Sequence, residues 1–405
     1  MERIKKVAVA TGFGILFSAL VLGGLGSVPA KAAEKQLLVG SVHSMSGTAS
    51  RWGIICTRGT QGAVDTYNEK GGLKIGEDIY KVKLINYDSG GTPEGAVTAA
   101  HRLIFGDGVK YIIGINMRRC STALQPVAEK EKVVAVGAYL LQSKDMAPPN
   151  YYSFSIWPDQ GDIYVAWFSW LRKTHPTIKT LAILNKDDDY GRGAVQSMKK
   201  VLENYPDYKI VYEQYYPVET VDFYPYLAKI KMVDPSYIDI GCVETRASGL
   251  IVKQAYQLGL NKIIFNSCAS YGEDLVKIAG AEACSNVLFS SAPIAGTPGA
   301  TPRMENLNKL SLVKYNEPFD PLTAGWYDAA YATLTAIEKA QNLDTTKVVQ
   351  VMGADNFRWD SIFGTAKFKG KKLIGQNRSI SYAYCIYGIE KGKTVLKATV
   401  PPEAD

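Results

Sequence analysis

The chain has 405 residues, 46% of them hydrophobic, with 46 Lys and Arg against 39 Asp and Glu and a formal net charge of +7. This composition excludes a disordered chain, a collagen-like repeat and a small disulfide scaffold, and the length supplies apolar mass for about two domains. Three His and six Cys residues, with no CxxC spacing, give little support for zinc or thioredoxin-type sites. We therefore expect a globular protein with buried thiols, at most one disulfide, no metal and no cofactor.

The first 32 residues have the pattern of an export signal. A basic start over residues 3–6 precedes an apolar stretch over residues 7–28, and Ala30-Lys31-Ala32 supplies a small-x-small cleavage site. Removing this segment leaves 42 basic and 38 acidic residues over 373 positions, a net charge of +4. The apolar stretch approaches the ~20 residues that span a bilayer, so an uncleaved anchor is the alternative. Its five glycines favour cleavage, and we expect a signal peptide over residues 1–32 and a periplasmic protein.

From residue 36 onward, β-rich runs alternate with amphipathic helical runs. Gly71-Gly72 ends the first helix, and Pro93 suits the first turn of the second. The expected strands are residues 37–42, 82–87, 111–114 and 133–136, and the expected helices are residues 53–70, 93–104 and 126–130. Repeated βα units of this kind require a parallel sheet with helices on both faces.

The alternation pauses at Met146-Ala147-Pro148-Pro149-Asn150 and then begins again. The second set of expected strands is 180–184, 209–212, 238–240 and 263–265, with helices over 163–171, 191–202, 223–231 and 247–258. Residues 293–302 predict a loop, followed by helices over 322–340 and 345–352 and by strands over 365–368 and 380–389, with a turn at Gly392-Lys393. This C-terminal part has too few strands to stand alone. The fold class is therefore α/β, with two doubly wound units between which the chain crosses more than once.

Groups that could carry out a reaction are scarce. Neither a Walker loop nor a GxSxG elbow occurs, and His43, His101 and His175 are scattered along the chain. Asp187-Asp188-Asp189 lacks the ligand spacing of a calcium loop and is more typical of a capping loop before a helix. Lys and Arg are dispersed and the mature charge is small, so nucleic acid is a poor partner. These features favour a binding protein over an enzyme.

Ligands of open α/β sheets bind at the carboxyl ends of the strands, where helix N-termini present free N–H groups. Two lobes that face each other in this way would form a cleft. The strand-end segments that could contact a ligand are His43–Gly53, Asn116–Ser121, Gly137–Leu140, Asp189–Gly191, Cys242–Arg246 and Asn266–Ser270.

Short motifs occur in a fixed order along nearly the whole mature chain. They are Leu38-Val39-Gly40 with Ser46-Gly47 and Trp52-Gly53, Tyr67-Asn68-Glu69-Lys70-Gly71-Gly72, Asp88 with Pro93 and Ala96, Asp189-Tyr190-Gly191-Arg192-Gly193, Lys253-Gln254-Ala255 with Leu258-Gly259-Leu260, and Phe368 with Gly370. Each is weak alone, but in this order they make the chain resemble the type I periplasmic solute-binding proteins of ABC transporters, the leucine/isoleucine/valine-binding family.

The resemblance implies two Rossmann-like lobes joined by a three-segment hinge. The N-terminal lobe would comprise residues 33–156 and 290–361, and the C-terminal lobe residues 157–289 and 362–405. We expect a monomer that closes on a small molecule and presents it to an ABC permease in the inner membrane. Closure follows because the ligand contacts both lobes only in the closed state. The alternative is a periplasmic sensing subunit that signals to a membrane receptor.

The resemblance also indicates which residues contact the ligand. Trp52 and Tyr190 fall where the family places aromatic side chains against the ligand, and the alternatives are a rim or core Trp and a Tyr that packs at a helix start. Arg118 and Arg119 occupy the loop after Gly114, where two guanidinium groups suggest a bidentate clamp on an anion, or else a solvated rim. Ser121 is the nearest hydroxyl.

Two departures from the family pattern concern the ligand. Relatives grip an α-carboxylate with a Ser/Thr pair where this chain has Gly137-Ala138-Tyr139-Leu140, and the acid expected after Phe265 is replaced by Asn266-Ser267-Cys268. Glu244, after the neighbouring strand, is the possible replacement for that acid. A buried ammonium group without a carboxylate partner would cost several kcal/mol. The sequence thus slightly favours a carboxylate or aromatic acid over a branched-chain amino acid, with Tyr139, Trp52 and Trp157 as an aromatic cage. The candidate ligand-binding residues are Ser46, Trp52, Arg118, Arg119, Ser121, Ala138, Tyr139, Tyr190, Glu244, Thr245, Asn266 and Cys268.

Overall fold

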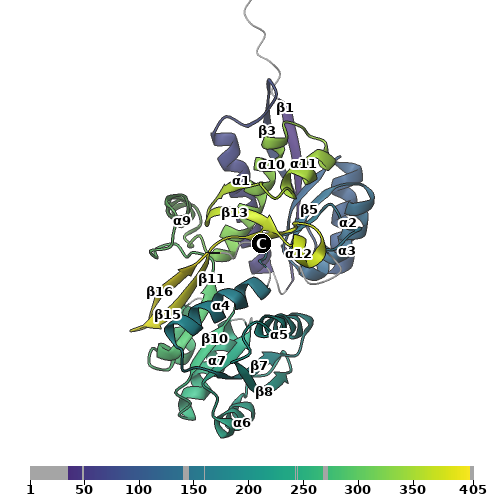
Figure 1. Cartoon of the computed structure of the whole chain (residues 1–405). Helices are drawn as coiled ribbons and strands as arrows, with labels where there is room; N and C mark the ends of the chain where they lie inside the picture. The colour runs from purple at the N-terminus through teal and green to yellow at the C-terminus, as the bar shows by residue number, and fades with distance from the viewer. Residues whose placement is uncertain are drawn as a thin grey trace, which may run out of the picture. The chain divides into compact units, whose positions relative to one another are not determined.

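The computed structural model describes residues 35–47, 50–139, 146–158, 160–241, 243, 245–267 and 272–401. The expected signal peptide lies outside these residues, as do two of the candidate ligand-binding residues, Glu244 and Cys268. The described residues form an α/β structure with two sheets (Figure 1).

The first sheet is built mainly of parallel strands. Its order is β12-β13-β14-β6-β5-β4-β1-β3-β2, and the strands from β14 to β3 pair in parallel, with antiparallel strands at both edges. These strands are β1 (Lys35–His43), β2 (Leu73–Ile75), β3 (Asp78–Asp88), β4 (Tyr111–Ile115), β5 (Val134–Gly137), β6 (Ser153–Ser155), β12 (Trp359–Ser361), β13 (Gly364–Lys369) and β14 (Ser379–Ser381).

Helices cover both faces of the first sheet, because the apolar side chains of its strands alternate between the two faces. Val39 and Ile113 face one set of helices, whereas Val42 and Ile112 face the other. The first set is α1 (Ser50–Glu69), α10 (Pro321–Ala340) and α11 (Thr345–Met352), and the second is α2 (Pro93–His101), a π-helical turn (Arg102–Gly106) and α3 (Arg118–Lys130).

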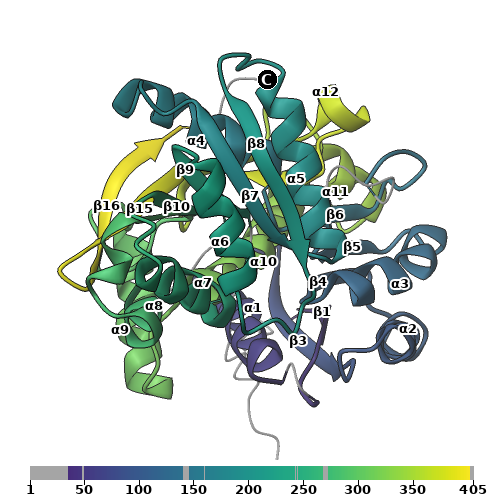
Figure 2. The same cartoon turned by 90° about the horizontal axis from the view of Figure 1, so that it is seen from below.

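The second sheet repeats this plan in the order β16-β15-β11-β10-β9-β7-β8, with β15 and β16 as an antiparallel hairpin beside parallel strands. Its strands are β7 (Thr180–Lys186), β8 (Lys209–Tyr216), β9 (Tyr237–Gly241), β10 (Ile263–Asn266), β11 (Val287–Ser291), β15 (Tyr384–Glu390) and β16 (Lys393–Val400). One face carries α4 (Gln160–Thr174) and α5 (Asp189–Leu202), and the other carries α6 (Tyr224–Val233), α7 (Thr245–Gln257), α8 (Gly272–Ala279) and a 3₁₀ turn (Ala283–Asn286) (Figure 2).

The predicted doubly wound fold is confirmed, and the chain changes sheet three times: after β6, after β11 and between β14 and β15. Two expected boundaries differ from the hydrogen bonding. The predicted N-terminal lobe resumed at residue 290, but Ser290 and Ser291 pair with β15 in the second sheet. Residues 364–381 pair in the first sheet, whereas the predicted C-terminal lobe took all of residues 362–405. Phe368 explains this placement, because its ring packs against Phe154 and Trp359 in the core of the first lobe. The single strand expected over residues 380–389 is consequently two strands in two sheets.

Helix α9 (Pro302–Tyr315) was not predicted, because the loop-like residues before it masked its start. Thr301 caps it by accepting a hydrogen bond from the backbone N–H of Met304, and Pro302 occupies its first turn. Both are recognised start signals. A short helix, α12 (Lys371–Ile374), follows β13.

Four cysteines, Cys56, Cys120, Cys284 and Cys385, are buried free thiols, as expected, while Cys242 and Cys268 lie outside the described residues. Over those residues, no helix combines the length and the hydropathy needed to cross a bilayer.

Helices α1 and α10 approach each other closely because Gly59 has no side chain. A Cβ atom built at Gly59 would lie 2.2 Å from the backbone oxygen of Thr323 and 3.0 Å from the backbone nitrogen of Tyr327. Backbone atoms inside a helix cannot move aside cheaply, so this contact fixes the residue at position 59 as glycine.

We expect Gly59→Ala to destabilise the protein by about 1–3 kcal/mol, because α1 and α10 would have to separate. The matched control is Gly193→Ala in α5, where an added Cβ has no atom within 4 Å. This control should gain about 0.5–1 kcal/mol of helix stability. Denaturant unfolding measures both changes, and equal effects of the two substitutions would contradict this account of the packing.

Candidate functional site

The carboxyl ends of the central first-sheet strands meet at one edge. His43 is in register with Asp88 across β1 and β3, and Val42 with Ile115 across β1 and β4. The segments that follow these strands therefore gather along that edge, which is where α/β proteins bind ligands.

Asp88 organises the loop after β1. Its Oδ1 accepts hydrogen bonds from the backbone N–H groups of Met45 (2.7 Å), Gly90 (2.7 Å) and Ser46 (3.3 Å). Burial opposes ionisation, but these hydrogen bonds and one from the Ser46 hydroxyl hold the pKa of Asp88 below its usual value. Ser46 is exposed, and its role here is to hold the loop together with Asp88.

His43 is buried at the end of β1. Its Nε2 lies 3.3 Å from the Thr60 hydroxyl, and its ring packs edge-on against Trp326 with centroids 5.2 Å apart. Burial lowers the pKa of His43 to about 3, against a smaller opposing effect of the Asn116 side chain. The imidazole is therefore neutral at physiological pH and acts as a polar support beneath the edge.

Arg118 and Arg119 lie in the first turn of α3, so the expectation that they occupy a loop is wrong. The residue before them, Met117, is extended and makes no side-chain capping hydrogen bond. By contrast, a Thr or Asp side chain caps each of α2, α5, α9, α10 and α11. Arg119 is exposed, and its Nε donates a 2.6 Å hydrogen bond to the Gly91 carbonyl. The first turn of α3 thus combines uncapped N–H groups with two guanidinium groups.

Ser121, Ala138 and Tyr139 are all buried and bond to the fold itself. The Ser121 hydroxyl accepts the N–H of Ala138 (3.1 Å) and donates to the carbonyl of Ile115 (3.3 Å). The Tyr139 hydroxyl donates to the Ser121 carbonyl (3.3 Å), and its ring packs with Met146. The structure therefore does not place Tyr139 in an aromatic cage with Trp52, because Tyr139 is fully buried.

Trp52 lies in the first turn of α1 and is 54% exposed. An indole with this exposure on a surface helix is open to contact from outside the first lobe. Trp157 lies elsewhere, in the segment after β6, where its ring meets Trp326 edge-on at 6.4 Å. Of the three aromatic residues expected to form a cage, Trp52 alone has a largely exposed side chain.

The second sheet presents a polar cluster at its own carboxyl edge. Tyr190, half-buried in the first turn of α5, accepts a 2.7 Å hydrogen bond from Nε2 of Gln160. The Oε1 of Gln160 accepts from the Ser267 hydroxyl at 3.4 Å. Gln160 was missed in the sequence because its partners are 30 and 107 residues away. Thr245 begins α7 at the same edge and is half-buried.

Asn266 is buried and holds the loop after β9. Its Nδ2 donates to the carbonyl of Val243 (2.9 Å) and to the hydroxyl of Ser248 (2.7 Å). The side chain thus links β10 to the start of α7. Asn266 was expected to contact the ligand, but its buried side chain instead positions the start of α7 from beneath the edge.

Asp239, which the sequence did not single out, is fully buried in β9. Its Oδ1 accepts the N–H of Gly241 (2.8 Å) and the hydroxyl of Tyr164 (3.2 Å), while Oδ2 has no hydrogen-bond partner among the described residues. Burial raises the pKa of Asp239 to about 7. The sequence does contain a signal for a buried acid, because Asp239 stands alone between the apolar residues Ile238 and Ile240.

Asp239→Asn should remove a pH-dependent part of the stability. The native pKa is about 7, above an unfolded value near 4, so the folded state binds more protons in this range. In the wild type this group therefore lowers the free energy of unfolding as pH rises from about 4 to 7, by up to about 4 kcal/mol. His43 acts in the opposite direction, since its lowered pKa removes stability as pH falls below about 6.5.

The measurement is denaturant unfolding of both proteins between pH 4.5 and 7.5, which cancels the shared contribution of His43. The stability of the variant relative to the wild type should rise with pH. Asp274→Asn, at an exposed ion pair with Lys277, is the control. Parallel curves for Asp239→Asn and the wild type would show that Asp239 is not the buried acid described here.

Comparison with known proteins gives the family. The chain matches the family model described as periplasmic binding protein over residues 36–392. A leucine-, isoleucine-, valine-, threonine- and alanine-binding protein of Pseudomonas aeruginosa is 24% identical over 350 residues, covering 84% of this chain and 88% of the relative.

Two solved structures share the fold. The branched-chain amino acid transporter substrate-binding protein of Streptococcus pneumoniae, in complex with isoleucine, has a TM-score of 0.70 at 21% identity and covers 91% of this chain and 99% of its own. A solute-binding protein of an ABC transporter from R. palustris, in complex with benzoate, has a TM-score of 0.70 at 17% identity, covering 91% and 98%.

The expected family is confirmed by the match over most of the described chain. Its members are solute-binding proteins, not enzymes; they bind small molecules and work with ABC permeases. The chain belongs to the periplasmic binding protein family, as a type I periplasmic binding protein of ABC transporters.

Proposed function

We propose that the mature protein is the substrate-binding protein of an ABC importer and that it captures a small organic acid, aromatic or aliphatic, between its two lobes by hinge closure. The observation that carries this proposal is the first turn of α3, where uncapped N–H groups and Arg119 lie at the carboxyl edge of the first sheet. Export by the predicted signal peptide would deliver the protein to the periplasm.

A carboxylate suits this first turn for two reasons. Helix N-termini favour negative charge, and a guanidinium group can bind both carboxylate oxygens. The bond from Arg119 to the Gly91 carbonyl uses Nε and fixes the side chain at the edge. Hydrogen bonds to charged groups contribute about 1.5–3 kcal/mol each, so a few of them and one stacked aromatic ring approach the ~8 kcal/mol of micromolar binding.

An ammonium group finds less support at the second sheet. Asp187 pairs with Arg192, and Asp188 both caps α5 at Gly191 and pairs with Lys186. Asp239 is buried with a raised pKa. The acids that the structure describes at this edge are thus engaged or enclosed, which favours an acid over an amino acid. Glu244, outside the described residues, is the position that would pair with an ammonium.

Closure supplies the second half of the proposed site. Trp52 on α1 would cover one side of the ligand, and the Tyr190–Gln160 pair would meet it from the other lobe. Three crossing segments form the hinge, so the lobes can rotate as units. Ligand contacts made only in the closed state drive this equilibrium.

The first test is a thermal-shift screen of mature protein that has been stripped of ligand by unfolding and refolding. We expect benzoate-like or short aliphatic acids to raise the melting temperature by several degrees, because a ligand at 100 times its Kd stabilises by about 2.7 kcal/mol. Leucine, isoleucine and valine should have little effect. Stabilisation by these amino acids with no response to the acids would contradict the proposed ligand class.

The second test uses Trp52→Ala and Arg119→Met with the acid that the screen identifies. Each should weaken binding about 10-fold or more, since each removes a stacked ring or a charge-assisted hydrogen bond. Phe105→Ala and Arg102→Met are the matched controls, because both residues are exposed and follow the C-terminal end of α2, away from this edge. Calorimetric titration gives the affinities, and an unchanged Kd in both test variants would displace the site.

A further inference from the structure

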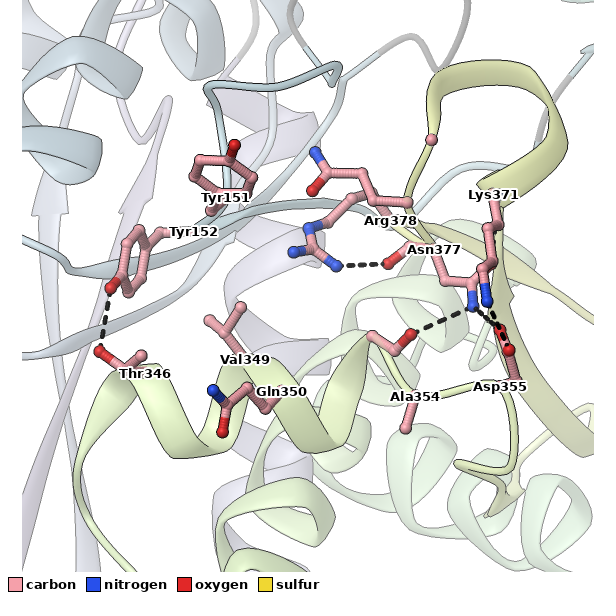
Figure 3. Close-up of a pocket in the computed structure, with 13 residues that line it drawn as sticks. Tyr151, Tyr152, Thr346, Val349, Gln350, Ala354, Asp355, Lys371, Asn377 and Arg378 are labelled. Carbon is pink, nitrogen blue, oxygen red and sulfur yellow. Dashed lines mark hydrogen bonds and ion pairs between the residues drawn. The ribbon is translucent and has the colours of Figure 1, made fainter.

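A cavity of about 480 Å³ lies at the opposite edge of the first sheet (Figure 3). Its walls include Tyr151 and Tyr152, which come directly before β6, and Arg378, which comes directly before β14. Because β6 and β14 run parallel, the cavity lies at their amino ends. It is therefore separate from the site at the carboxyl edge described above.

Arg378 is buried in the wall of this cavity, with only 5% of its surface exposed. Its backbone is fixed in the sheet, since its N–H donates to Lys369 and its carbonyl accepts from Ser155. The guanidinium group lies over the ring of Phe154, 4.5 Å from the centroid. Its Nη1 donates to the Asn377 carbonyl at 2.7 Å, and its Nε has no hydrogen-bond partner among the described residues.

The acids near Arg378 are committed to other groups. Glu129 accepts the backbone N–H groups of Tyr151 and Tyr152 and the hydroxyl of Ser153. Asp355 accepts hydrogen bonds from Lys371 and from Asn377, as Figure 3 shows. Across the described residues, no carboxylate comes within ion-pair distance of Arg378. A buried guanidinium group without a carboxylate partner is costly, and an anion in the cavity would relieve that cost.

The cavity also has the shape and lining for an organic anion. Gly353 makes room for the guanidinium group, because a Cβ at this position would lie 2.6 Å from Nη1 of Arg378. Tyr151, Val349 and Ala354 supply apolar surface, and Lys371 lines the cavity in its ion pair with Asp355. A volume of this size is ordinary for a small-molecule site.

We propose that this cavity binds a small organic carboxylate, with Arg378 as its counter-charge. The carboxylate would accept hydrogen bonds from the guanidinium group of Arg378, and its hydrocarbon part would pack against Tyr151 and Val349. The strands β6 and β14 both lead into segments that cross to the second sheet. A bound carboxylate would thus contact the amino ends of both strands, opposite the ends from which the chain crosses. This proposal does not depend on the function proposed above.

Calorimetric titration of the mature protein with benzoate tests it. We expect a binding event whose affinity Arg378→Met lowers at least 10-fold and Arg119→Met leaves unchanged. Gly353→Ala, which crowds Nη1 but keeps the charge, should weaken the same event. Arg378→Lys should give an intermediate affinity, and Arg102→Met is the control for loss of a surface arginine.

The outcomes separate this site from the one at the carboxyl edge. The two proposals together predict one event that depends on Arg119 and a second that depends on Arg378. If every benzoate-binding event depended on Arg119 and none on Arg378, the cavity proposal would be overturned while the importer function would stand. Inorganic phosphate is the second probe, and binding as tight as that of benzoate would overturn the assignment to carboxylates. Unfolding curves of each variant confirm that it folds; should Arg378→Met fail to fold, Gly353→Ala decides the question.

Discussion

The in-register pairing of parallel strands is the constraint on which the rest of the molecule depends. Because β1, β3 and β4 end together, the loops after them share one edge, and Asp88 and Asn116 can tie those loops to the chain after β1. A slip of one residue would turn Val39 and Val42 to the wrong faces and expose apolar side chains. The register that buries the two cores therefore also assembles the candidate site.

Much of the fold could be predicted because buried parallel strands are short, almost purely apolar runs. Tyr111–Ile115 is an example, since all five of its residues are buried. The sheet change between β14 and β15 could not be predicted, because Tyr382 is apolar and buried like the strands on either side. The packing of Phe368 in β13 against Phe154 and Trp359 holds β13 and its partner β14 in the first sheet, and these rings are distant in the sequence.

The candidate site was less predictable than the fold, because residues of the same chemical type differ in how deeply they are buried. Trp52 and Tyr139 carry the same expectation in the sequence, yet one is exposed and the other is enclosed beneath Ser121. Gln160 and Asp239 acquire their roles from partners on other strands and helices. A single sequence does not encode such distances directly, so family motifs locate the edge but not the side chains that are open along it.

The two arginines at opposite edges of the first sheet illustrate two ways to bind an anion. Arg378 is already desolvated, so its attraction for a carboxylate is strong without any movement of the lobes. Arg119 is exposed, and water screens it until something covers it. In the proposed function, the second lobe provides that cover, so the full attraction of Arg119 for the ligand develops only on closure. An exposed guanidinium group at the carboxyl edge therefore favours coupling between binding and closure, whereas a buried one would retain its ligand in either state.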